Sequence, residues 1–167
     1  MQPHPYSLTV ATPAAQDRWE ALQHRIPLMV VLVASSALSA MLFLLRSIHI
    51  GAPVYSFLNW NLFLAWLPLL AASVAWLLQG NAQRPRLRVV PVLVLWLLFF
   101  PNAPYIVTDL MHLKPHDGVP LWFDVIMLTS YAWNGLMVGF VSLWIVQGLL
   151  TRWFGFAAGW LGALSAL

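Results

Sequence analysis

The chain alternates between long apolar segments and short segments that hold most of its charges. The first apolar segment, 26–45, runs for twenty residues without a charge between Arg25 and Arg46. At 1.5 Å of rise per residue, a helix of this length crosses a hydrocarbon core of about 30 Å. The same pattern repeats along the chain and predicts an all-α fold, a polytopic transmembrane helical bundle with about five spans: 26–45, 57–79, 89–108, 120–150 and 153–167.

The two ends of the chain differ from the central spans. Residues 1–25 carry charges of both signs, and Thr12 as an N-cap with Trp19 and Leu22 at helical spacing predicts a cytoplasmic or interfacial helix that leads into the bundle. The last segment, 153–167, reaches only about 22 Å as a helix. We therefore expect this span to be incomplete and the natural protein to be longer.

The third span contains a break. Pro101 and Pro104 remove two helical hydrogen bonds and disfavour helical geometry in the residues before them. Asn102 could then cap a short new helix by accepting a hydrogen bond from the N–H of Tyr105. Freed backbone groups at that depth have to face protein or a wet cavity, because lipid offers no hydrogen bonds. The alternative is that the helix ends at Phe100 and an exposed loop follows.

Composition supports a membrane protein and excludes several other classes. Of 167 residues, 61% are hydrophobic and 8% are charged, and the mean hydropathy is +0.78. An ordinary soluble domain has roughly 25% charged residues. The absence of cysteine from the sequence excludes disulfides and thiolate metal sites. The net charge of +3 does not indicate a nucleic-acid partner, because the basic residues are scattered between apolar segments.

The positions of Lys and Arg predict the orientation. With the N-terminus in the cytoplasm, the inner segments hold six basic residues and the outer segments hold two. The inner ones are Arg18, Arg25, Arg84, Arg86, Arg88 and Arg152, and the outer ones are Arg46 and Lys114. The positive-inside rule favours this arrangement.

In that orientation, polar residues from separate segments meet near the outer face. Asn61 begins the second span, Asn102 and Asp109 lie towards the end of the third, and Asp124 begins the fourth. We expect these groups to share one site. A charged residue inside a membrane usually faces the bundle interior.

The fourth span has two distinct faces. At 100° per residue, Tyr131, Gly135 and Ser142 lie within about 20° of Asp124, whereas Trp122, Trp133 and Trp144 lie on the opposite side. We expect Asp124 to face the interior and the tryptophans to face lipid, with helix packing as the alternative for the tryptophans. The Gly135/Gly139 and Gly155/Gly159 spacings predict close packing of the fourth span against the fifth.

The outer connection, "TDLMHLKPHDGVP", supplies the candidate chemistry. Asp109 and His112 are one helical turn apart and could act as a general acid and base, with Asp124 as a third catalytic candidate. Asp109, His112 and His116 are candidate ligands of a divalent metal, although no established metal-binding spacing is present. Asn61, Asn102, Tyr105 and Tyr131 are candidate binding residues.

Three stretches resemble a known family. "FPNAPYIVTDLMHL", "PLWFDVIMLTSYAWNGLMVGF" and "NWNLFLAWLPL" resemble the bacterial membrane family called domain of unknown function 1361, over about residues 59–150. The resemblance implies a multi-pass protein of the bacterial inner or plasma membrane and implies no activity. Members typically continue past the fifth span into a stretch resembling GRFLRWNSWD, which would lie near Asp109 and Asp124.

Three functions are compatible with these patterns. The protein could be a structural or assembly component that has the lipid bilayer and another membrane protein as partners. It could be a membrane-embedded enzyme or metal site that faces the exterior, or a small transporter component. Apolar inner halves of the second and third spans count against a transport pathway.

Overall fold

The computed structural model describes residues 13–80 and 87–165. The chain forms two compact units, Met1–Val31 and Leu32–Leu167. The described part of the first unit is the beginning of helix α1, Pro13–Ile50, and the second unit contains the rest of that helix and all the others. The proposed N-cap, Thr12, lies outside the described residues.

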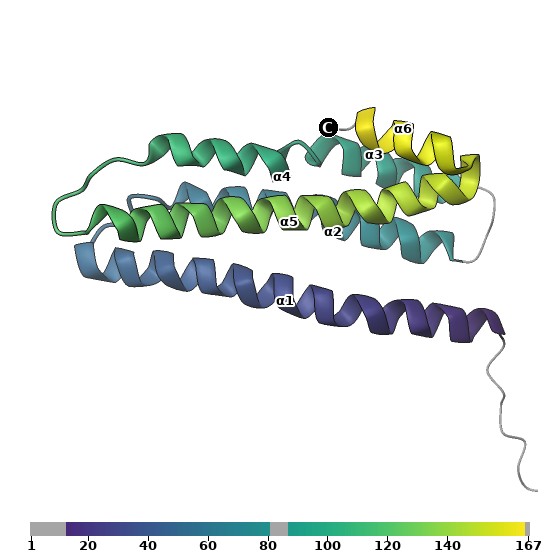
Figure 1. Ribbon diagram of the computed structural model, residues 1–167, viewed down its shortest axis with the longest axis horizontal. Coiled ribbons are helices and arrows are strands. Elements are labelled where there is room, and N and C mark those ends of the chain that lie inside the picture. The colour runs from purple at the N-terminus through teal and green to yellow at the C-terminus, as the bar shows by residue number, and fades with distance from the viewer. Residues whose placement is uncertain (1–12, 81–86, 166–167) are drawn as a thin grey trace, which may run out of the picture. The chain divides into compact units, whose positions relative to one another are not determined.

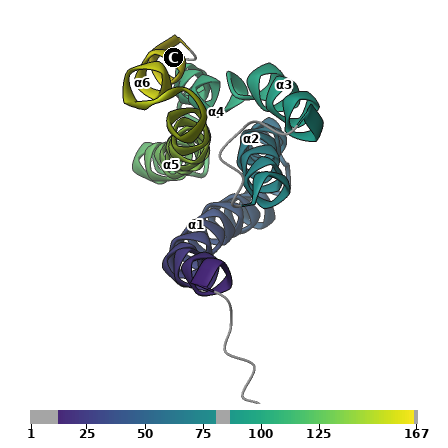
Figure 2. The same ribbon diagram turned by 90° about the vertical axis from the view of Figure 1, so that its right-hand side faces the viewer.

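The predicted all-α architecture is confirmed. After α1 come α2 (Phe57–Gln79), the 3-10 turn η1 (Leu87–Val89), α3 (Val90–Phe99), α4 (Asn102–Tyr105), η2 (Ile106–His112), α5 (Leu121–Phe154) and α6 (Phe156–Ser165) (Figure 1). Helices α2 and α5 pack against each other, α3 packs against α2, and α6 packs against α5, as the end-on view in Figure 2 shows.

Four segments are long and apolar enough to cross a membrane: Arg25–Ile50, Phe57–Gln79, Leu87–His112 and Leu121–Phe154. The first continues through Arg46 to Ile50, so Arg46 does not mark its end as the sequence suggested. The last helix, α6, begins at Phe156 rather than Trp153 and has ten residues. Gly155 separates it from α5 with φ 89°, a left-handed conformation that glycine adopts without strain.

The break in the third span is structured, and the helix does not give way to an exposed loop at Phe100. Phe100 and Pro101 keep right-handed helical angles, and the chain continues through α4 into η2. The predicted cap is wrong, because the N–H of Tyr105 bonds to the carbonyl of Pro101 at 3.1 Å. The Asn102 side chain instead donates from Nδ2 to the carbonyl of Phe99 at 3.0 Å, which satisfies a carbonyl just before the two prolines.

Two glycines of α5 provide the surface against which the broken segment packs. A Cβ at Gly135 would collide with the Ile106 side chain, and a Cβ at Gly139 would lie 2.8 Å from the Cβ of Ala103. The prediction that this glycine pair packs against the last helix is therefore wrong. The spacing identified a face of close approach, but the partner is the 103–106 segment. On the last helix, Gly159 approaches Thr151 of α5 as expected.

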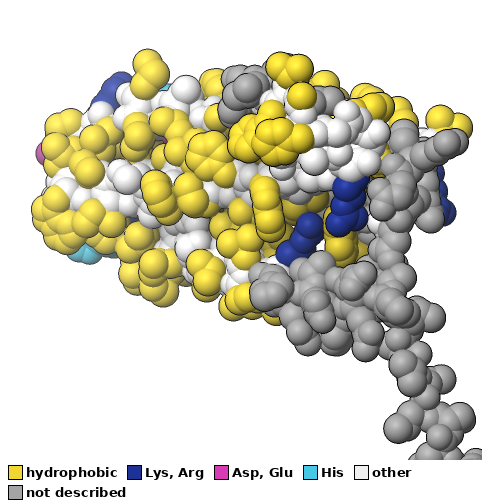
Figure 3. Space-filling model, turned by 45° about the vertical axis from the view of Figure 1, so that its right-hand side comes forward, with side chains coloured by type: hydrophobic (Ala, Val, Ile, Leu, Met, Phe, Trp, Pro, Cys, Tyr) yellow, Lys and Arg dark blue, Asp and Glu magenta, His cyan; other side chains and the backbone are white. Residues whose placement is uncertain are grey.

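The two predicted faces of α5 are confirmed. Asp124, Tyr131, Gly135 and Ser142 are buried, whereas Trp122, Trp133 and Trp144 are 58–62% exposed. Exposed apolar side chains are common on the other helices too, and Figure 3 shows hydrophobic atoms over much of one face. A surface of this kind suits a lipid environment.

Candidate functional site

The polar candidates gather at one end of the bundle, which we call the paired end. It is formed by the last turns of α1, the first turns of α2, the whole of η2 and the first turns of α5. These segments lie together at the left of Figure 1. The helices thus bring residues far apart in the sequence to the same level.

The most buried charged group at the paired end is an ion pair between α1 and α5. Arg46 Nε donates to Asp124 Oδ1 at 2.6 Å, and Arg46 Nη2 donates to Asp124 Oδ2 at 3.0 Å. Both residues are at most 2% exposed. A bidentate contact of this kind combines charge attraction with a fixed geometry. Asp124 therefore faces the interior, and its partner is a residue that the sequence analysis had placed in a flanking segment.

Two aromatic rings surround this ion pair. The Arg46 guanidinium carbon lies 4.5 Å from the centroid of the Tyr55 ring, a cation–π contact. The His116 ring meets the same tyrosine edge-on at 5.5 Å. His116 Nδ1 lies 3.6 Å from Asp124 Oδ2 and 2.8 Å from the carbonyl oxygen of Lys114. Burial raises the pKa of Tyr55 above its ordinary value, so its hydroxyl stays protonated beyond the pH of about 10 at which an exposed tyrosine ionises.

The second polar pair joins α2 to η2. Asn61 Nδ2 donates to both carboxylate oxygens of Asp109, at 3.0 and 2.8 Å. Asp109 is 3% exposed. Asn61 and Asp109 therefore meet as expected, but this pair is separate from the Arg46–Asp124 pair, so the single shared site that the sequence predicts does not form. Each carboxylate has its own partner on a different helix.

A third contact and an apolar cluster complete the paired end. Tyr131 donates its hydroxyl proton to Asn59 Oδ1 at 2.6 Å and so ties α5 to α2. The apolar cluster consists of Tyr55, Leu58, Leu62, Ile106, Met127, Leu128 and Tyr131. Six of its members lie on α2, η2 and α5, and Tyr55 lies in the turn before α2, so apolar side chains pack at the same level as the polar contacts between these elements.

A further polar contact holds α1 against α5 deeper in the bundle. Asn134 Nδ2 donates to the backbone carbonyl of Ser35 at 3.1 Å and to Ser39 Oγ at 2.8 Å. The hydroxyl of Ser35 donates back to Asn134 Oδ1. On α1, Ser39 precedes Arg46 by seven residues. On α5 the order of their partners is reversed, because Asn134 follows Asp124 by ten residues. The two helices therefore run antiparallel, and polar contacts join them at two levels.

The remaining predicted site residues take other positions. Tyr105 is exposed, and Asn102 bonds to its own backbone segment. The exposed His112 packs its ring against Phe57, with 5.0 Å between centroids. Within the part of the chain that the structure describes, no three His, Asp or Glu side chains are placed to hold a metal ion. The metal candidates Asp109, His112 and His116 therefore do not form such a group.

The contacts of Arg46, Tyr55 and Asn134 were not predicted from the sequence. Arg46 had a usable signal, since Leu32, Ser39 and Arg46 recur every seven residues and all three are buried. A seven-residue repeat marks one face of a helix. This repeat places Arg46 on the packed face of α1 and not in a flanking loop.

Comparison with known proteins identifies the family. The family model described as "Protein of unknown function (DUF1361)" matches residues 60–167. This confirms the resemblance seen in the sequence and extends it through α6. No curated protein and no solved structure matches the chain.

Proposed function

The chain belongs to the family DUF1361, and from the polar contacts between its helices we propose that it is a structural or assembly component of a bacterial inner membrane. In this role the buried polar residues fix how its own helices pack. The exposed apolar faces then contact lipid and a membrane-protein partner.

One observation carries this proposal: the buried polar side chains are used on one another, across helices. Arg46–Asp124 and Asn134–Ser39 join α1 to α5, Asn61–Asp109 joins α2 to η2, and the contact of Tyr131 with Asn59 joins α5 to α2. In lipid, apolar surface gives little drive for helices to associate, so hydrogen bonds and close packing decide the arrangement. The charges of Arg46 and Asp124 in particular are used on each other and are not free to act on a substrate.

The orientation belongs to the same proposal. Because Arg46 is paired with Asp124 inside the bundle, it no longer counts as a free basic residue of an outer segment. Lys114 is then the basic residue left on that side, against the six on the other side of the predicted topology. This supports a cytoplasmic N-terminus, and the paired end then faces the periplasm or the exterior.

A second candidate function rests on Asp109. This carboxylate is buried, yet within the described residues its hydrogen bonds come from the neutral amide of Asn61 and not from a cation. A buried acid without a bonded counter-charge is more typical of a binding or proton-handling group than of a structural lock. This favours an exterior-facing binding or enzymatic site at Asp109 as the alternative.

The substitution Asp124→Asn tests the structural proposal. It leaves the Arg46 charge buried without a counter-charge, so the amount of monodisperse protein extracted from membranes should fall severalfold. Arg152→Gln, at an exposed arginine of α5, is the matched control and should behave as the wild type. The proposed role in assembly predicts that the wild type migrates in a larger complex in mild detergent.

The outcomes separate the two candidates. If Asp124→Asn protein is obtained at wild-type yield and thermal stability, the structural proposal is wrong. The near-isosteric Asp109→Asn keeps an acceptor for Asn61 and should leave the yield unchanged under both candidates. Loss of cellular function in that variant with normal protein levels would favour the site at Asp109.

A further inference from the structure

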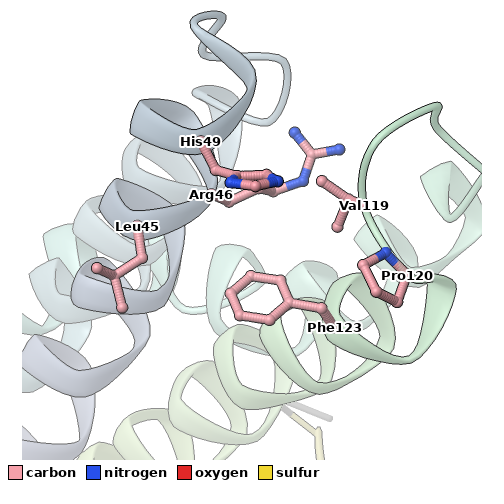
Figure 4. Close-up of a pocket in the computed structure, with 6 residues that line it drawn as sticks. All are labelled: Leu45, Arg46, His49, Val119, Pro120 and Phe123. Atoms are coloured by element: carbon pink, nitrogen blue, oxygen red, sulfur yellow. The ribbon is translucent and has the colours of Figure 1, made fainter.

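A cavity of about 280 Å³ opens at the paired end, beside the ion pair. It lies between the last two turns of α1 and the start of α5, and is lined by Leu45, Arg46, His49, Val119, Pro120 and Phe123. Figure 4 shows Leu45 on its left, Phe123 below it, Val119 and Pro120 on its right, and His49 and Arg46 along its top. The cavity therefore has an apolar wall and a polar upper edge.

The level of the cavity in the bundle restricts what can enter it. Its α1 residues belong to the last turns of the span Arg25–Ile50, and Phe123 belongs to the first turn of the span Leu121–Phe154. The ends of spanning helices lie where hydrocarbon gives way to lipid headgroups. A molecule with both a polar and an apolar part fits this level better than a fully polar solute does.

The hydrogen-bonding state of His49 defines the polar part of the ligand. His49 Nε2 lies 3.1 Å from the carbonyl oxygen of Gly118. A carbonyl only accepts hydrogen bonds, so this nitrogen carries the proton. In the neutral ring, Nδ1 is then an acceptor, and no other group of the described chain bonds to it. The Arg46 guanidinium is already neutralised by Asp124, so the edge of the cavity carries little net positive charge.

We propose that this cavity binds a phospholipid whose headgroup carries a hydrogen-bond donor, such as the ammonium of ethanolamine or a hydroxyl of glycerol. The headgroup donor bonds to His49 Nδ1, and an acyl chain lies against Leu45 and Phe123. Choline headgroups lack such a donor and bind less well. This inference goes beyond the structural role, because it assigns a ligand that the helix contacts do not require.

The test is native mass spectrometry of the full chain in detergent, with phosphatidylethanolamine, phosphatidylglycerol and phosphatidylcholine offered separately. We expect the first two lipids to be retained roughly threefold to tenfold more than the third, the fold-change that one hydrogen bond provides. Soluble glycerol phosphate and ethanolamine phosphate should not compete, because they lack the chain. Retention of phosphatidylglycerol alone would indicate simple charge attraction and would overturn the proposal, as would equal retention of all three.

Two variants locate the site. Leu45→Trp fills the cavity from a half-exposed position away from the ion pair and should abolish retention of all three lipids. His49→Phe should remove the preference for donor headgroups while the thermal transition confirms that the protein is folded. His112→Phe, at an exposed histidine of the same end that does not line the cavity, is the matched control. Unchanged lipid retention in the folded Leu45→Trp variant would show that the cavity is not the site.

Discussion

Arg46 and Asp124 lie 78 positions apart in the sequence and form a bidentate ion pair with contacts of 2.6 and 3.0 Å inside the bundle. Both side chains are almost fully withdrawn from the surface. A pair of this kind stabilises a fold mainly because either partner alone is very costly to bury. Removing one partner and removing both are therefore expected to have very different consequences.

The first prediction concerns the difference between removing one partner of this ion pair and removing both. Arg46→Leu and Asp124→Leu should each destabilise the protein by about 3–5 kcal/mol, since each leaves one buried charge uncompensated. The double variant should recover much of this loss. Thermal denaturation in detergent measures all three variants, and a double variant less stable than both single ones would contradict the prediction.

The second prediction concerns the close approach at Gly135. Gly135→Ala forces a methyl group into the Ile106 side chain, and overpacking of this kind should cost about 1–3 kcal/mol. Gly148→Ala, on the same helix, is the matched control because nothing lies within 4 Å of the added Cβ. The control should be neutral or gain up to about 1 kcal/mol from helix propensity. Equal stability of the two variants would show that the 103–106 segment can move away.

The third prediction concerns the contact of Asn134 with α1. Asn134→Ala removes its bonds to Ser35 and Ser39, and Ser39→Ala removes one of them. A double-mutant cycle on these two substitutions should give a coupling energy of about 0.6 kcal/mol, the average for hydrogen bonds between membrane helices, and at most about 1.7 kcal/mol. Additive effects would mean that Asn134 does not hold α1 through Ser39.

The fourth prediction follows from the raised pKa of Tyr55, which burial causes. The unfolded chain loses this proton near pH 10, whereas the folded protein keeps it to higher pH. The free energy of unfolding should therefore fall as pH rises above about 10. Tyr55→Phe should show a smaller fall than the wild type, measured by denaturation between pH 8 and 11. Tyr105→Phe, at an exposed tyrosine, should keep the wild-type profile.

The sequence predicted the features that depend on helical geometry. The 100° step fixes that Asp124 and Tyr131 share one face and that Trp133 lies on the other. The expectation that a charge faces the bundle interior then predicted which face is buried. The break at the two prolines also followed, because each proline beyond the first turn of a helix lacks the N–H of a helical hydrogen bond, and Pro101 and Pro104 lie only three residues apart.

The partners of these faces could not be predicted in the same way. The Gly135/Gly139 spacing shows where another segment comes close, but not which segment it is. Arg46 was interpreted as a boundary because a charge after an apolar run usually lies at the membrane surface. Its burial depends on Asp124, a residue of a helix that begins more than seventy residues later. The Asn102 side chain had two competing backbone partners, and local geometry selected the Phe99 carbonyl.

The distance in sequence between Arg46 and Asp124 also constrains biogenesis. A ribosome adding about 5–20 residues per second needs roughly 4–16 s to proceed from one residue to the other. During that interval the newly inserted first helix carries an arginine with no counter-charge. Because Arg46 lies only one turn from the end of its helix, its long side chain can reach the headgroup region while it waits. Insertion of the first helix is therefore separated in time from its docking, which is completed only when the fourth span arrives.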